Sequence, residues 1–211
     1  MPKKQQTLFQ VKLGLFSLLG ITLFGLVLFL IDLHLLPLVF LAIAINLSLV
    51  APFFDIPALV EKGSLTYHSL FLLSERKKKG SVTIHGGTLF DYYFVLDKEL
   101  SGQERTKLIM AEYLKGLLQL IQQEEKGVIL KGTSYIINEK TAAKIGMKKV
   151  STDPIQTFIL AFNYFNLMAS VSLARKAIKF PNISKVSTFQ GTVEDIQKNE
   201  NYIKKLILKL E

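Results

Sequence analysis

The sequence predicts an α+β fold, in which a transmembrane hairpin of two helices precedes a cytoplasmic mixed α/β domain. Three observations lead to this prediction. Two long uncharged stretches lie near the N-terminus, strand-like and helix-like segments follow them, and the charged residues are concentrated in the later part of the chain. Between Lys12 and Asp55 the only formally charged residue is Asp32, although 20% of all 211 residues are charged.

The two uncharged stretches have the length of membrane spans. Residues 13–31 form a run of 19 without a charge, and residues 33–54 form a second run of 22. At about 1.5 Å per residue, a helix of the first length spans roughly 28 Å, close to the thickness of a bilayer's hydrocarbon core. A signal peptide is the competing interpretation, but its hydrophobic core would be shorter. Asp32 and His34 fall in the connecting turn, where solvated interfacial residues are favoured over a functional pair inside the membrane.

The distribution of positive charge predicts the orientation of these spans. The turn between them carries no Lys or Arg, whereas basic residues precede the first span and follow the second. They include Lys3, Lys4, Lys12, Lys62 and the run at residues 76–79. Because basic residues are retained on the cytoplasmic side, both termini are expected in the cytoplasm of a multi-pass membrane protein.

A third apolar stretch, residues 155–174, has polar interruptions and basic residues at both ends. A spanning helix would place one of those basic clusters on the wrong side of the membrane. Asp153 and Pro154 supply a helix start. We therefore expect a helix that packs in the domain or lies along the membrane surface, rather than a third span.

Four parts follow from these patterns. They are a basic N-terminus at 1–12, the hairpin at 13–54, a juxtamembrane connector at 55–63 and the cytoplasmic domain at 64–211. The domain is expected to open with a three-stranded antiparallel meander. Its predicted strands are residues 64–73, 81–87 and 88–96, with a polar turn at 75–80.

Local signals predict the elements that follow. Ser101 and Glu104 form a capping-box pattern at the start of a long helix. Residues 127–137 are predicted as a strand, and 147–152 form a further strand. Between them Asn138 caps a short helix through Ile145, and Gly146 fits the left-handed position just past its end. A last amphipathic helix is expected from a Thr192 cap to Leu210.

The stretch "IHGGTLFDYYFVL", residues 84–96, raises the question of a catalytic pair. With Gly86 and Gly87 as the central residues of a hairpin turn, His85 and Asp91 would lie on opposite faces of the sheet. A plain hairpin is therefore favoured over a His–Asp dyad. His68 could neighbour His85, but two strand histidines without a nearby carboxylate form a poor metal site, and no metal is predicted.

The amino-acid composition excludes several kinds of functional site and partner. The chain has no cysteine, which excludes disulfides, thiolate nucleophiles and thiolate metal sites. The net charge of +9 lies near predicted membrane segments without an interleaved aromatic–basic motif, so nucleic acid is not expected as a partner. Lysines 77–79 are either an exposed turn or a site for anionic lipid headgroups.

The predicted order of elements from 64 to 152, together with "NEKTAAKIGMKKV" at residues 138–150, resembles the core of GNAT-type N-acetyltransferases. The resemblance implies that an acyl-CoA binds between the fourth and fifth strands of that core and that its acyl group passes to an amine. Tyr135 and Asn138 are the positions that it selects for a first test. The family's glycine-rich phosphate loop is not matched, since "DKELSGQERTKL" contains only Gly102.

Two functions from different classes remain open at this level. The favoured one is an integral membrane protein of unassigned activity, without a cofactor, whose domain binds a protein partner or lipid at the inner surface of the membrane. The alternative is a membrane-anchored, GNAT-like acyltransferase that uses acyl-CoA. A hydrolase built on His85 and Asp91 is a third hypothesis, and the sequence does not decide whether the protein is an enzyme.

Overall fold

The computed structural model describes residues 3–134 and 137–211 and divides into two compact units, Met1–Pro57 and Ala58–Glu211. The boundary falls inside the connector that the sequence predicts at 55–63. The chain is thus an α+β protein in which a helical N-terminal unit precedes a sheet domain.

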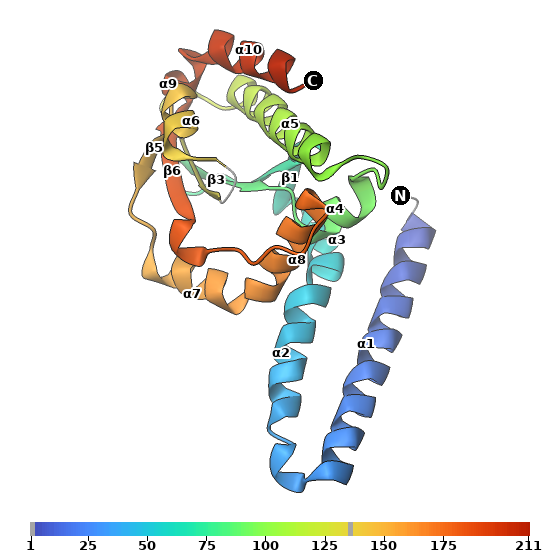
Figure 1. Cartoon of the computed structure of the whole chain (residues 1–211). Coiled ribbons are helices and arrows are strands. Elements are labelled where there is room, and N and C mark those ends of the chain that lie inside the picture. The colour runs from blue at the N-terminus through green and yellow to red at the C-terminus, as the bar shows by residue number, and fades with distance from the viewer. Residues whose placement is uncertain (1–2, 135–136) are drawn as a thin grey trace. The chain divides into compact units, whose positions relative to one another are not determined.

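The N-terminal unit contains a pair of long helices. Helix α1 (Lys3–Ile31) is followed by a short 3-10 turn, η1 (Leu33–Leu35), and by α2 (Leu38–Val50), which runs back antiparallel to α1 (Figure 1). Asp32 accepts a hydrogen bond from the backbone N–H of His34 at 2.9 Å, so this exposed pair forms the cap of the turn. Segments Lys3–Ile31 and Leu33–Val50 are each long and apolar enough to cross a membrane.

Polar contacts fasten the two helices to each other. The Ser17 hydroxyl donates to Asn46 Oδ1 from the facing helix. Closer to the N-terminus, the Gln10 side chain donates to the carbonyl oxygen of Phe53 at 2.7 Å. Phe53 opens α3 (Pro52–Glu61), which carries the chain into the second unit. The first contact connects α1 with α2, and the second connects α1 with the start of α3.

The second unit is built on a six-stranded mixed sheet with the order β1-β2-β3-β4-β6-β5. Strands β3 and β4 are parallel, and every other neighbouring pair is antiparallel. The strands are β1 (Leu65–Ser69), β2 (Leu72–Glu75), β3 (Ser81–Gly86), β4 (Ile129–Ser134), β5 (Lys148–Val150) and β6 (Ser187–Thr192). The parallel pair requires a crossover, which α4 and α5 supply.

The helices of this unit begin only in part where local capping signals predict them. They are α4 (Leu89–Val95), α5 (Gly102–Gln123), α6 (Glu139–Lys144), α7 (Pro154–Phe162), α8 (Tyr164–Arg175), α9 (Val193–Gln197) and α10 (Glu200–Leu210), with a short 3-10 turn, η2 (Ile183–Lys185). Of these, α4, α8 and α10 were not predicted as separate helices. Ser101, Asn138 and Thr192 each accept the expected N-cap hydrogen bond. Gly146 has a φ of +86°, so the prediction of a left-handed residue after α6 is confirmed.

The main core lies between the sheet and the helices α5, α9 and α10 (Figure 1). Leu114 and Leu117 of α5 are completely buried, as are Ile196 of α9 and Ile203 of α10. Burial of each such side chain contributes about 1.5–3 kcal/mol. The apolar face of α5 contributes Leu114, Leu117 and Ile121 to this core, and Met110 and Leu118 pack against it.

The predicted meander is wrong in two places. Residues 64–73 do not form one strand, because the chain turns at Leu70 and Phe71 and continues as β2, which pairs antiparallel with β1. Residues 88–96 do not form a strand either. Thr88 caps α4 and forms a reciprocal capping box with Asp91, so the hairpin at Gly86 and Gly87 does not exist.

Two further features differ from prediction. Strand β6 was not predicted, although it pairs with both β4 and β5. The last helix is divided into α9 and α10 at Lys198 and Asn199.

The stretch at 155–174 is also divided, into α7 and α8, which bend by 70° at Asn163. Together the two helices satisfy the length and composition of a broken membrane span or a re-entrant loop.

A candidate ligand cleft between β3 and β4

The parallel strands β3 and β4 separate at their carboxyl ends. Their pairing runs from Ser81 opposite Ile129 to Ile84 opposite Gly132 and then stops. Both strands nevertheless continue for two more residues, to Gly86 and Ser134. The gap between two diverging parallel strands offers backbone groups and space to a ligand at the carboxyl edge of the sheet, where α/β proteins usually bind ligands.

On the α5 side of the sheet, the divergence opens into a small cavity of about 80 Å³. It is lined by Gly86 and Gly87, by Thr133 and Ser134, and by residues that include Tyr92, Tyr113 and Met110. Burial raises the pKa of the Tyr113 hydroxyl well above its usual range, so this phenol is protonated at neutral pH.

The two glycines play different parts in the cavity. A Cβ on Gly87 would lie 2.6 Å from the Phe71 ring and 2.8 Å from the Tyr92 ring, so only glycine fits there. A Cβ on Gly86 would meet no atom within 4 Å, and its φ is not positive. A side chain added at Gly86 would therefore extend into open space in the cavity.

On the opposite side of the sheet lies a second cavity, of about 240 Å³. Its lining includes His85 of β3, Lys131 of β4, and Asp153 and Gln156 at the start of α7. Thr133 borders both cavities, which places them on the two faces of the sheet at the same opening. Polar groups from four elements thus converge on the second cavity.

Threonine hydroxyls beside the second cavity hydrogen-bond to one another. Thr188 of β6 lies 3.0 Å from the hydroxyl of Thr133 and 3.0 Å from that of Thr152. This chain of hydroxyls connects β4, β6 and the segment that leads into α7.

His85 and Asp91 do not form a catalytic dyad, because each is engaged elsewhere. His85 Nε2 lies 3.0 Å from Glu75 Oε1 on the neighbouring strand, and the pair is partly exposed. Asp91 is buried and accepts hydrogen bonds from the backbone and hydroxyl of Thr88 at 2.7 and 2.8 Å. The Tyr67 hydroxyl donates to its other oxygen at 2.5 Å. Asp91 is thus a structural cap of α4.

The ionisation of this cluster follows from its burial. Burial raises the pKa of Asp91, although the donors from Tyr67 and Thr88 oppose the shift. Burial, followed by the neighbouring Asp91 carboxyl, raises the pKa of Tyr67. Both effects keep the Tyr67 proton in the hydrogen bond, which suits a fixed structural link rather than proton transfer.

The remaining predicted residues have local structural roles or lie outside the described part. His68 is buried, and its Nε2 lies 2.8 Å from the Ser74 hydroxyl. Asn138 accepts from the Thr141 backbone as the cap of α6. Tyr135 lies outside the described residues. Among the residues that the structure describes, no group of three or more His, Cys, Asp or Glu side chains could hold a metal ion.

The end of α8 packs against the N-terminal end of α5 and leaves no space for a side chain at Gly102. Arg105 is buried and donates to the carbonyl oxygens of Asp97, Lys98 and Leu173 at 2.8–3.1 Å. A Cβ on Gly102 would lie 2.0 Å from the carbonyl oxygen of Arg175, so the end of α8 packs directly on this glycine. The backbone here is arranged to hold α8.

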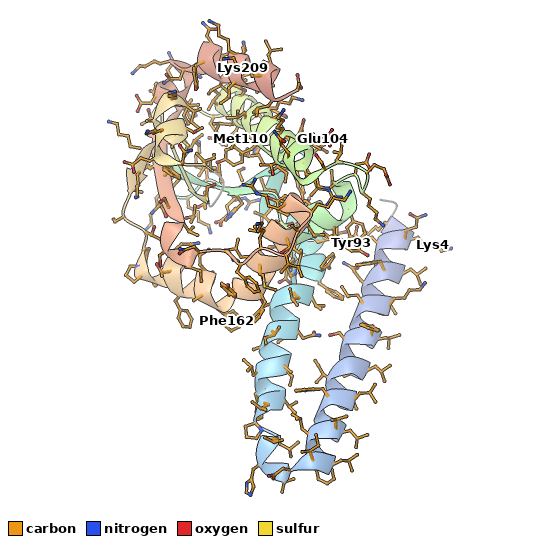
Figure 2. The ribbon with its side chains drawn as sticks, viewed as in Figure 1. Lys4, Tyr93, Glu104, Met110, Phe162 and Lys209 are labelled. Carbon is orange, nitrogen blue, oxygen red and sulfur yellow. The ribbon has the colours of Figure 1, made fainter. Side chains whose placement is uncertain are left out.

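A basic groove of about 510 Å³ runs beside this helix start. Its lining includes Lys107 of α5, Arg175 at the end of α8, and Lys179. Met110, on α5 in Figure 2, borders both this groove and the cavity on the α5 side of the sheet. The groove and the cavity on the α5 side therefore lie next to each other at Met110.

Comparisons with known proteins found no matching family model, no matching curated protein and no matching solved structure.

Proposed function

We propose that α1 and α2 form a transmembrane hairpin in the cell membrane, with both termini in the cytoplasm. The length and apolar surface of the two helices support the hairpin. The orientation is supported by the basic residues that flank the spans and by the absence of Lys and Arg from residues 32–37. On this proposal the sheet domain is held at the inner surface of the membrane.

We further propose that the domain is an acyltransferase that binds an acyl thioester, such as acyl-CoA, in the cleft between β3 and β4. The observation that carries this proposal is the end of the parallel pairing at Ile84 and Gly132, with a cavity on each face of the sheet. The GNAT resemblance implies an acyl-CoA between the fourth and fifth strands of that family's core. In this chain we assign that role to the diverging parallel strands β3 and β4.

The two cavities suit the two reactants of such a transfer. An amine nitrogen attacks the thioester carbonyl, the new C–N bond forms, and the C–S bond breaks to release a thiol. The amine must lose a proton, and the leaving sulfur must gain one. His85, paired with Glu75 in the second cavity, is the candidate proton acceptor. Tyr113, which lines the first cavity, is the candidate donor.

The phosphates of a coenzyme would be held differently from the glycine-loop arrangement. Because α8 closes the start of α5, the backbone there is less suited to cradle a pyrophosphate. Lys107, Arg175 and Lys179 of the adjoining groove offer cationic side chains instead. This assignment reconciles the missing glycine loop with coenzyme binding.

Substitution at Gly86 tests the proposal directly. Gly86→Val places its Cβ where no neighbour lies within 4 Å, so the added side chain should reduce the space in the cleft without displacing the backbone. Titration calorimetry with the full chain in detergent, using acetyl-CoA and longer acyl-CoAs, should give binding that this variant weakens by at least about tenfold, or roughly 1.4 kcal/mol. Thr66→Val, on the exposed side of β1, is the matched control and should bind as the wild type does.

The outcome that contradicts the proposal is equally specific. If the wild type binds no acyl-CoA of any chain length, the acyltransferase is excluded while the hairpin stands. If both Val variants bind as the wild type does, the ligand occupies another site. Alkaline extraction of membranes tests the hairpin separately, because a chain with two spans stays in the lipid fraction.

A further inference from the structure

Helix α7 carries an apolar face that the domain does not bury. Ile155, Phe158, Ile159 and Phe162 follow the i, i+3, i+4, i+7 spacing of one helical face and are 68%, 72%, 44% and 57% exposed. None of the residues of α7 is buried, and Figure 2 shows Phe162 at the outside of the domain. A single exposed apolar side chain is ordinary, but a complete helical face of them indicates a binding surface.

The segment after α8 adds to this surface. Ile178 and Phe180 are 80% and 73% exposed. This segment leads from α8 to η2, and η2 contacts α7. The exposed apolar residues of α7 and of the segment 176–182, which we call the α7 surface, thus belong to one part of the domain.

After the exposed Asp153 that caps α7, the sequence of this region carries only basic charges. From Pro154 to Val193 the sequence contains no Asp or Glu, and its basic residues are Arg175, Lys176, Lys179 and Lys185. Arg175, Lys176 and Lys179 are exposed. Arg175 and Lys179 also line the basic groove, and Lys176 Nζ donates to the carbonyl oxygen of Lys98 at 2.8 Å. Apolar residues accompanied by cations match an anionic bilayer surface, in which acyl chains lie beneath negative headgroups.

The connection to the N-terminal unit selects lipid over other occupants. The candidate span ends at Val50, and the sheet domain begins at Ala58. Eight residues cover at most roughly 29 Å even when fully extended, so a bilayer crossed by α2 is always within reach of the domain. A second copy or another protein would have to compete with that high local concentration of lipid.

We propose that the α7 surface docks on the anionic inner leaflet, with α7 lying in the headgroup region parallel to the membrane. The docking rests on the proposed hairpin but not on the acyltransferase activity. It has a consequence for the cleft, because Ile155 and Gln156 of α7 also line the second cavity. The docked domain presents this cavity beside the lipid headgroups.

The chain has no cysteine, so single cysteines can report position in the full-length protein. Phe158→Cys and the matched control Leu208→Cys, on the exposed side of α10, would each carry an environment-sensitive fluorophore. Both proteins are reconstituted in vesicles of phosphatidylcholine and phosphatidylglycerol that contain spin-labelled lipid. We expect the label at 158 to be quenched at least about threefold more than the label at 208, and more by a shallow than by a deep spin label.

A second pair of proteins tests the charge. Adding Lys176→Glu and Lys179→Glu to the Phe158→Cys protein should remove most of the quenching, and replacing phosphatidylglycerol by phosphatidylcholine should do the same. The change Lys204→Glu with Lys205→Glu, on α10, is the matched charge control and should leave the quenching unchanged.

The possible failures are distinguishable. Loss of both labelled proteins from the vesicles on alkaline washing overturns the hairpin on which the docking rests. If the protein stays in the vesicles, equal quenching at 158 and 208 overturns the docking alone. Stronger quenching by the deep spin label overturns it in favour of a third span, and protection at 158 that depends on protein density overturns it in favour of a second copy.

Discussion

Leucine is used in opposite ways by the two units of this protein. In the sheet domain Leu114 and Leu117 of α5 are fully buried, whereas Leu18 and Leu23 of α1 are 63% and 52% exposed. Helix α5 alternates apolar and polar residues so that one face packs on the sheet, but α1 is apolar on all sides over its central turns.

This difference in the exposure of apolar side chains supports the proposal that α1 lies in a membrane. An amphipathic helix is complete once its apolar stripe meets a core, but a helix that is apolar all round needs an apolar surrounding. The α7 surface is intermediate, since its apolar face is exposed while the rest of its domain buries a core of normal composition. Substitutions at equivalent residue types should therefore have effects that depend on the unit.

The largest effect is expected in the core of the sheet domain. Leu117→Ala should lower the free energy of unfolding by about 2–5 kcal/mol, because it leaves a cavity between α5 and the sheet. The seven tyrosines all follow residue 57, so urea unfolding in detergent followed by tyrosine fluorescence reports on this unit alone. Leu23→Ala in α1 is the matched control, and a change above about 0.5 kcal/mol there would contradict the comparison.

An added charge in α1 should weaken membrane insertion, although shortening the same side chain to alanine should have little effect on stability. Leu23→Arg should make membrane insertion of α1 less favourable by about 2.5–3.5 kcal/mol, since the residue lies near the centre of an uncharged helix. The fraction of chain that resists alkaline extraction measures this loss. Leu208→Arg places the same charge on an exposed site of α10 and should extract like the wild type. Equal loss in both variants would refute membrane burial of α1.

The smallest expected effect is on the pH dependence of stability, which His68 and the control residue His34 test. Burial lowers the pKa of His68, so the unfolded chain binds a proton more readily than the folded one. Stability should consequently fall as the pH drops through the ordinary histidine value of about 6.5, by at most about 1.4 kcal/mol per pH unit. His68→Gln should remove this contribution from the urea titrations, whereas His34→Gln in the exposed turn should retain it. An unchanged slope in His68→Gln would exclude the assignment.

The elements that the sequence predicted correctly are those whose signals are local. The caps at Ser101, Asn138 and Thr192 each depend on a hydrogen bond from a backbone N–H three residues away. The same kind of signal was available for α4, since Thr88 and Asp91 have the spacing of a capping box. The two glycines before Thr88 suggested a hairpin and obscured it.

The features that were missed depend on distant contacts. Strand β6 has a mixed composition, and its place is fixed by pairing with β4 and β5. Its partners in these strands lie 38 to 63 positions earlier in the chain. The cleft between β3 and β4 likewise depends on where two strands diverge, and no residue type marks that point. His85 was selected from the sequence, but its partner Glu75 comes from the adjacent strand rather than from the glycine loop.

The position of β6 has a consequence for synthesis of the chain. Strands β4 and β5 do not pair with each other, because β6 lies between them and joins both by antiparallel pairing. On a translating ribosome, β4 and β5 emerge before their shared neighbour, and each exposes an unsatisfied backbone edge until residues 187–192 follow. A nascent polypeptide that stalls before Ser187 would have an incomplete sheet with unpaired backbone N–H and C=O groups. Such edges can pair with the edges of other chains and cause aggregation.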